Sequence, residues 1–130
     1  MGTDLNGMKL LLVEDNEVNI EIAKCLLEGD GIQITSAENG QVAVDMFAAS
    51  EPGEYDVILM DVMMPVMDGV TAARTIRAMD RPDAAEVPII AMTANNGEED
   101  IQQTYEAGMN AHLSKPLNLA EILKVLSDYR

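Results

Sequence analysis

Residues 57–69 read VILMDVMMPVMDG, an apolar run that ends abruptly in Asp61. A segment that is apolar at every position is typical of a strand buried on both faces of a parallel sheet. Packing does not explain a carboxylate at the end of such a strand, because an unpaired ionised group is costly to bury. We therefore expect Asp61 at the rim of the sheet, beside a cation, a hydrogen-bond network or solvent. A plain turn or helix-capping aspartate is the alternative, and Asp68 is expected to cap the helix that begins near Gly69.

The rest of the chain repeats this alternation of short strands and amphipathic helices. Strands are predicted at residues 9–13, 32–36, 57–60, 87–92 and 111–114, and a helix follows each of them. Such alternation implies parallel pairing with right-handed crossovers and helices on both faces of the sheet. We predict an α/β fold, an open doubly wound sheet in one domain.

Apolar spacing predicts which face each helix buries. The first helix, after Asn16, carries an apolar stripe, and the cysteine within it is expected to be a core residue rather than a reactive thiol. The fourth helix, residues 98–107, is sparsely apolar and should be one of the less firmly held elements. The stripe comprises Val18, Ile22, Cys25 and Leu26, and the anchors of the fourth helix are Ile101 and Tyr105.

Composition excludes several classes of protein. The 130 residues carry 8 basic and 23 acidic side chains, and the net charge of −15 disfavours direct contact with nucleic acid or anionic lipid. Four aromatic residues are too few for base-stacking platforms, and one cysteine cannot form an intrachain disulfide. No apolar run approaches the roughly 20 residues of a membrane span. We expect a cytoplasmic protein without direct membrane insertion, with residues 1–7 as a flexible lead-in and 8–130 as the domain.

Polar residues that packing does not explain follow four of the five predicted strands. They are Glu14 and Asp15 after the first, Asp61 after the third, Thr93 after the fourth and Lys115 after the fifth. Ligands of open α/β sheets bind outside the carboxyl ends of the strands, so these side chains should meet. Three carboxylates in one crevice would repel unless a divalent cation lay among them. Oxygen ligands favour Mg²⁺ or Mn²⁺.

The same residues suit a phosphoryl group. A cation, a lysine, a hydroxyl and a helix N-terminus together neutralise and hydrogen-bond its oxygens. There is no glycine-rich phosphate loop and the first strand–helix turn is acidic, which argues against a bound nucleotide. One carboxylate would then be the nucleophile, and Asp61 is the candidate, with Glu14 and Asp15 as metal ligands. The alternative is a solvated acidic rim in which Lys115 pairs with one carboxylate.

Four motifs resemble those of the receiver domain of two-component response regulators: LVEDN at 12–16, DVMMPVMDG at 61–69, TA at 93–94 and KP at 115–116. The resemblance extends over residues 8–130. The segments NEVN at 16–19 and HLSKP at 112–116 make it most similar to the receivers of hybrid sensor histidine kinases. It implies a flavodoxin-like, five-stranded parallel sheet of order 2-1-3-4-5.

This resemblance implies a phosphorylatable signalling switch. Asp61 would accept a phosphoryl group, in a Mg²⁺-dependent reaction, from a phosphohistidine of a histidine kinase or histidine phosphotransfer protein. The domain would catalyse its own phosphorylation and slow autodephosphorylation, as a signalling domain rather than a metabolic enzyme. Phosphorylation would change the surface that an unidentified downstream protein binds.

The resemblance also implies individual roles. Asp15, Asp61 and the Met63 carbonyl would ligate the metal, with Glu14 often acting through water. Thr93, the Ala94 N–H and Lys115 would bind the phosphoryl group, and Met63 and Asn95 would tune its hydrolysis. Thr93 would also switch together with residue 112, where the family usually has an aromatic and this chain has His112. This histidine is either a working switch residue or a surface residue on an edge strand.

Two other functions stay open at this point. One is an interaction module that binds metal or protein without phosphorylation, although such a module has no need of all five strand-end residues. The other is a flavodoxin-like cofactor carrier, which the acidic first loop and the lack of tryptophan disfavour. A stand-alone regulator and a domain of a longer hybrid kinase both fit the chain.

Overall fold

A computed structural model describes residues 6–29, 31–62, 66–93, 98–114 and 118–129, with the backbone alone for 98–100. The chain forms a five-stranded parallel sheet of order β2-β1-β3-β4-β5. Its strands are β1 Lys9–Val13, β2 Gln33–Ala37, β3 Val57–Asp61, β4 Ile89–Thr93 and β5 Ala111–Ser114. Its helices are α1 Glu17–Glu28, α2 Gly40–Ala49, α3 Gly69–Arg77, α4 Glu98–Glu106 and α5 Leu119–Asp128. The prediction of an α/β, flavodoxin-like, doubly wound sheet is confirmed.

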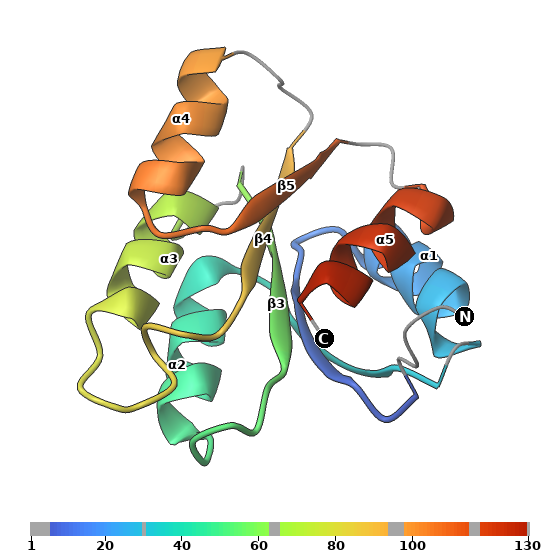
Figure 1. Ribbon diagram of the computed structural model, residues 1–130, viewed down its shortest axis with the longest axis horizontal. Coiled ribbons are helices and arrows are strands. Elements are labelled where there is room, and N and C mark those ends of the chain that lie inside the picture. Colours follow the sequence, from blue (N-terminus) through green and yellow to red (C-terminus); the bar gives the residue numbers. More distant parts are fainter. Residues whose placement is uncertain (1–5, 30, 63–65, 94–97, 115–117, 130) are drawn as a thin grey trace.

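The sheet separates two hydrophobic cores, because successive strand residues point to opposite faces. Leu11, Ile58 and Ile89 pack on one side against α2 and α3. Leu10 and Leu59 pack on the other side against α1 and α5. Figure 1 shows this arrangement, with α2, α3 and α4 on one side of the strands and α1 and α5 on the other. Within the described ranges, no helix combines the length and the apolar character needed to cross a bilayer.

Side chains cap the first turns of four of the helices. The Asn16 side chain accepts hydrogen bonds from the N–H groups of Val18 and Asn19, at 2.9 and 3.1 Å. Asp68 accepts one from Thr71 at 2.7 Å, which confirms its predicted role. Asn39 and Asn118 cap α2 and α5 in the same way. A capped helix begins at a defined residue, so the caps fix where these loops at the carboxyl edge of the sheet end.

The predicted buried face of α1 is wrong at three of its four residues, and only Leu26 of that stripe packs, partly buried, against the core. Val18 and Ile22 are 66% and 49% exposed, and Cys25 is exposed rather than in the core. The residues that α1 buries are Ala23 and Leu27. Two apolar stripes at helical spacing run along this helix, and only the crossing over the sheet decides which one packs. The stripe of Val18, Ile22 and Cys25 therefore faces solvent.

The predicted anchoring of α4 is also only partly right. Ile101 is half-buried, but Tyr105 is 45% exposed and is not an anchor of the core. Thr104 is the buried residue of this turn, at 2% exposure. Its hydroxyl donates a hydrogen bond to the Ile101 carbonyl at 2.6 Å, which allows a small polar side chain to be buried.

Arg77 ties α3 to two loops at the amino edge of the sheet. Its guanidinium donates to the carbonyls of Gly108 and Ala84, at 2.9 and 3.0 Å, and to Asn110 Oδ1 at 2.8 Å. The same Asn110 oxygen accepts the N–H of Ile89 at the start of β4. Burial lowers the pKa of Arg77. An arginine nevertheless keeps its charge at neutral pH, so these are charge-assisted hydrogen bonds.

We expect Arg77→Ala to lower the free energy of unfolding by about 2 kcal/mol, because it leaves two part-buried carbonyl acceptors without their donor. Urea unfolding followed by circular dichroism measures this loss. Arg74→Ala is the matched control, since Arg74 is exposed in the same last turn of α3 and should change stability by less than about 0.5 kcal/mol. Equal losses in the two variants would contradict the role given to Arg77.

A second arginine, Arg81, forms an ion pair with Asp83 after α3. The distance from Arg81 Nε to Asp83 Oδ1 is 2.6 Å, and the guanidinium lies 4.4 Å from the centre of the Phe47 ring. The hydrogen bond from Arg81 is the main reason why the pKa of Asp83 lies below its usual value. A further hydrogen bond from the Gly53 N–H also lowers the pKa.

The Asp83 pair predicts a pH dependence of stability. Because the pKa is lower in the folded state, the stabilisation is present above the ordinary value of 3.8 and is lost as the pH falls through the folded-state pKa. We expect Asp83→Asn to be less stable than the parent at pH 7 and the difference to shrink below about pH 4. Thermal unfolding at a series of pH values tests this, and a difference that is the same at every pH would rule it out.

Candidate functional site

Three polar side chains are buried at the carboxyl edge of the sheet. Glu14 follows β1, Asp61 ends β3 and Thr93 ends β4, with exposures of 3%, 3% and 5%. The parallel register places Val13 beside Met60 and Asp61 beside Met92, so the three strands end at the same level. Residues that are far apart in the sequence thus come together at this edge, as the polar residues at the strand ends predicted.

The carboxylates of Glu14, Asp15 and Asp61 form one cluster. One oxygen from each lies within 4.8 Å of the others, with Glu14 and Asp61 buried and Asp15 exposed. Opposite oxygens around an octahedral Mg²⁺ ion are about 4.2 Å apart, so small side-chain rotations bring this set to coordination distance. An all-oxygen, anionic donor set fits a hard divalent cation.

Glycine allows the loop after β3 to fold tightly against Asp61. A Cβ atom at Gly69 would lie 2.3 Å from the Asp61 carbonyl oxygen, so only glycine fits there. The Gly69 N–H donates to the Val62 carbonyl at 3.0 Å, and the Val62 N–H donates to the Met92 carbonyl at 3.1 Å. These contacts fix the backbone that carries the Asp61 side chain.

Two asparagines orient the buried Glu14 carboxylate. The Asn16 N–H and the Asn19 side-chain amide lie 3.3 and 3.4 Å from Glu14 Oε1. No individual role was predicted for Asn19 from the sequence. The feature that could have indicated one is an amide side chain in the first turn of a helix, close in sequence to an acidic strand end.

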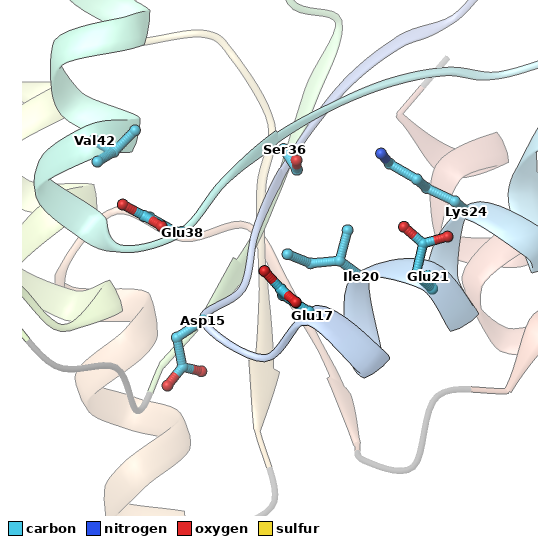
Figure 2. Close-up of a pocket in the computed structure, with 8 residues that line it drawn as sticks. All are labelled: Asp15, Glu17, Ile20, Glu21, Lys24, Ser36, Glu38 and Val42. Carbon is cyan, nitrogen blue, oxygen red and sulfur yellow. The ribbon is translucent and has the colours of Figure 1, made fainter.

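A polar groove lies beside Asp15, between α1 and the start of α2 (Figure 2). Its volume is about 600 Å³. In Figure 2 the side chains of α1 line one side of it, and the segment that leads from β2 into α2 lines the other. Its walls carry four carboxylates and one ammonium group, so the groove favours cationic partner groups. The lining residues are Asp15, Glu17, Ile20, Glu21, Lys24, Ser36, Glu38 and Val42.

This groove was not predicted from the sequence. The sequence feature that could have indicated it is the pair Glu17 and Glu21, which stand one helical turn apart shortly after Asp15. Glu38 joins them only because β2 pairs with β1 and ends at the same edge of the sheet.

Exposed apolar side chains accompany the acidic residues. Val66, five residues after Asp61, is 81% exposed and has a φ of 70°. A left-handed backbone costs a β-branched residue roughly 1–2 kcal/mol. Val18 and Ile22 of α1 are the other large apolar residues exposed near these loops. The surface around the carboxyl edge therefore combines negative charge with apolar contact area.

Four of the predicted site residues lie outside the described residues: Met63, Ala94, Asn95 and Lys115. Their roles stay predictions. The described neighbours are in place, since Thr93 pairs in register with Ser114, the residue before Lys115.

His112 is half-buried on β5 and does not simply face solvent. Its Nδ1 lies 3.3 Å from the Tyr105 hydroxyl, within hydrogen-bonding distance. The two rings meet edge to face, with centroids 6.3 Å apart and an interplanar angle of 85°. His112 thus contacts an aromatic ring, which Tyr105 of α4 supplies.

Comparison with protein families and curated sequences gives one consistent result. The family model of the response regulator receiver domain matches residues 10–127. A probable histidine kinase 1 from Oryza sativa subsp. indica is 37% identical over 95% of this chain, which spans 16% of that protein. Hybrid signal transduction histidine kinase B from Dictyostelium discoideum is 41% identical over 88% of the chain, which spans 6% of it. The chain thus matches a small part of these long kinases.

Solved structures agree with the sequence relatives. The receiver domain of sensor histidine kinase PA1611 from Pseudomonas aeruginosa, determined with a magnesium ion in its active-site cleft, has a TM-score of 0.85 and 40% identity. The match covers 95% of this chain and 97% of that one. The receiver domain of Ssk1 from Saccharomyces cerevisiae, crystallised with the phosphotransfer protein Ypd1, has a TM-score of 0.84 and 33% identity over 94% and 88% of the two chains.

The cluster predicts that losing one charge stabilises the metal-free protein. We expect Asp61→Asn to raise the free energy of unfolding by about 1 kcal/mol in chelator, because it relieves repulsion with Glu14 and Asp15. Asp45→Asn removes an equal charge from an exposed position on α2 and should have little effect. Chemical denaturation of the three proteins measures the difference, and a destabilised Asp61→Asn protein would contradict the prediction.

Proposed function

This chain belongs to the response regulator receiver domain family, and we propose that it is a phosphorylatable signalling switch. Asp61 accepts a phosphoryl group from a phosphohistidine partner in a Mg²⁺-dependent reaction. The observation that carries this proposal is the grouping of Asp61 with Glu14, Asp15 and the hydroxyl-bearing Thr93 at one edge of the sheet.

Asp61 suits the role of acceptor better than its two neighbours. Asp15 is exposed, and Glu14 lies in the loop after β1 rather than in a strand. Asp61 ends the central strand β3, between the ends of β1 and β4, with Thr93 ending β4 beside it. This central position supports Asp61, rather than its two neighbours, as the acceptor.

Glu14, Asp15 and Asp61 are the described residues that would hold Mg²⁺, together with the carbonyl of Met63. The bound ion would neutralise the carboxylates and the phosphoryl oxygens that approach them. Mn²⁺ has the same preference for oxygen ligands and is expected to substitute.

In the transfer, an Asp61 carboxylate oxygen attacks the phosphorus atom and forms a P–O bond. The P–N bond of the phosphohistidine breaks, and the released imidazole takes up a proton. The Thr93 hydroxyl, the Ala94 N–H and the Lys115 ammonium group would stabilise the negative charge on the phosphoryl oxygens. Water later attacks the same phosphorus atom, the bond between phosphorus and the Asp61 oxygen breaks, and inorganic phosphate leaves, at a rate that Met63 and Asn95 tune.

A protein donor fits the surface around the site. The acidic groove favours basic side chains, and Val18, Ile22 and Val66 provide apolar contact area. We infer a histidine kinase or a histidine phosphotransfer protein as the donor, and a downstream protein of unidentified kind. The domain would comprise residues 8–130 and act in the cytoplasm.

Acetyl phosphate, a small phosphodonor, tests this function. With Mg²⁺ we expect one phosphoryl group per chain by intact mass, because the domain itself supplies the catalytic groups. Asp61→Asn protein and a parent sample with chelator should gain none. The modified protein should also lose the group slowly on standing.

Two outcomes would reject the proposal. Addition of phosphoryl to the Asp61→Asn protein would show that another residue is the acceptor. A parent protein that binds Mg²⁺ but gains nothing, from acetyl phosphate or from a phosphorylated histidine phosphotransfer protein, would favour an interaction module instead.

A further inference from the structure

The start of α2 lies directly against the loop that follows β3. The Gly40 N–H donates a hydrogen bond to the Met67 carbonyl at 3.2 Å. Asp68, the next residue of the loop, caps α3 by accepting a hydrogen bond from the Thr71 N–H at 2.7 Å. The helices α2 and α3 are neighbours on one face of the sheet (Figure 1), so the bond at Met67 joins the start of one helix to the start of the other.

This close approach requires a glycine at position 40. A Cβ atom there would lie 2.5 Å from the Met67 carbonyl oxygen and 3.1 Å from the Cβ atom of Ala72. Ala72 is fully buried, and the Met67 oxygen belongs to the backbone, which cannot rotate away as a side chain can. Alanine is ordinarily favoured over glycine in a helix, so helix propensity does not explain Gly40. Contact with the loop explains it.

The loop segment that Gly40 contacts includes a strained residue. Val66 has a φ of 70°, in the left-handed region that is unfavourable for a β-branched side chain. Its side chain is 81% exposed, so burial does not offset the strain. A strained backbone persists only where its surroundings hold it in place. Hydrogen bonds at the next two residues, Met67 and Asp68, supply such constraints, and the first of them comes from α2.

The same segment ends against the backbone that carries Asp61. The Gly69 N–H donates to the Val62 carbonyl at 3.0 Å, and a Cβ atom at Gly69 would lie 2.9 Å from the Val62 Cα atom. A displacement of Met67, two residues before Gly69, is therefore passed on to the end of β3. Mg²⁺ requires near-ideal octahedral geometry with bonds of about 2.1 Å, so a small shift of one carboxylate weakens its binding.

We propose that the start of α2 braces the metal site, with Gly40 as a positioning residue that acts on Asp61 through Met67 and Gly69. This inference rests on the proposed function, because the metal site is the one that this function requires. Gly40 touches neither the ion nor the phosphoryl group. It determines how tightly the three carboxylates hold Mg²⁺, and the chemical step is unchanged once the ion is bound.

The Mg²⁺ affinity of Gly40→Ala tests the brace without any phosphorylation. The rise of the thermal unfolding midpoint with Mg²⁺ concentration gives the dissociation constant of each protein. We expect this constant to rise about tenfold over that of the parent, because the added methyl group displaces the Met67 backbone. With acetyl phosphate, the Mg²⁺ concentration for half-maximal phosphorylation should rise by the same factor. The rate at saturating Mg²⁺ should stay within about twofold of the parent rate.

Two variants are matched controls. Gly29→Ala adds the same methyl group at the end of α1, where a Cβ atom would meet no described atom within 4 Å, and it should bind Mg²⁺ like the parent. Phe47→Leu alters a fully buried side chain near the other end of α2. It should lower the unfolding midpoint and change the dissociation constant for Mg²⁺ by less than about twofold. The controls account for the added methyl group and for lost stability.

Asn39→Ala is a gentler change at the same place. The Asn39 side chain caps α2 by accepting a hydrogen bond from the Val42 N–H at 2.9 Å. Losing the cap loosens the first turn, which carries the Gly40 N–H, and we expect the dissociation constant for Mg²⁺ to rise about threefold. This variant decides the question if circular dichroism shows that Gly40→Ala does not fold.

The outcomes separate the brace from the proposed function. A folded Gly40→Ala protein with the parent's Mg²⁺ affinity overturns the brace, as does an equal loss of affinity in Phe47→Leu, and the proposed function stands in both cases. If Gly40→Ala does not fold, parent affinity in Asn39→Ala overturns the brace. A parent that binds Mg²⁺ but gains no phosphoryl group by intact mass overturns the proposed function, while the Mg²⁺ affinities still decide the brace. A parent that binds no Mg²⁺ overturns both.

Discussion

The side-by-side burial of two carboxylates, Glu14 and Asp61, at the end of a hydrophobic sheet is the constraint on which this structure depends. Both are almost completely shielded from solvent, and Asp15 adds a third charge at the rim. Such a cluster is unfavourable by itself, because like charges repel more strongly where water is excluded. The fold maintains it with well-packed strands beneath, and a divalent cation would remove the repulsion.

Much of the local structure at this edge holds the cluster in place. The caps at Asn16 and Asp68 start α1 and α3 directly after the loops that carry the acidic residues. Gly69 lets the second of these loops approach the Asp61 backbone closely. The opposite edge is held differently, by arginines that bridge backbone carbonyls. One edge of the sheet is therefore organised for stability, while the other concentrates unfavourable charge and exposed apolar groups where a ligand can use them.

Several features could be predicted from sequence because they depend on local chemistry or on one strong rule. The five strands and the gathering of Glu14, Asp15, Asp61 and Thr93 follow from apolar runs that end in polar residues, and the Asp68 cap follows from an aspartate placed just before a helix. The orientation of α1 could not be predicted, since Val18, Ile22 and Cys25 form as good a stripe as the residues that pack. The groove and the ring contact were missed because each joins side chains from different elements.

The sequence by itself determined the fold class, the residues at the strand ends and the class of chemistry they suit. These follow from hydrophobic periodicity and from the cost of burying charge, which act on each segment separately. Only the tertiary structure decided which helix faces are covered, how Glu38 comes to lie near Asp15, and that Tyr105 of α4 meets His112 of β5. The physical reason is that these contacts depend on how the helices cross the sheet. Many side chains packing together set that crossing, and no single segment encodes it.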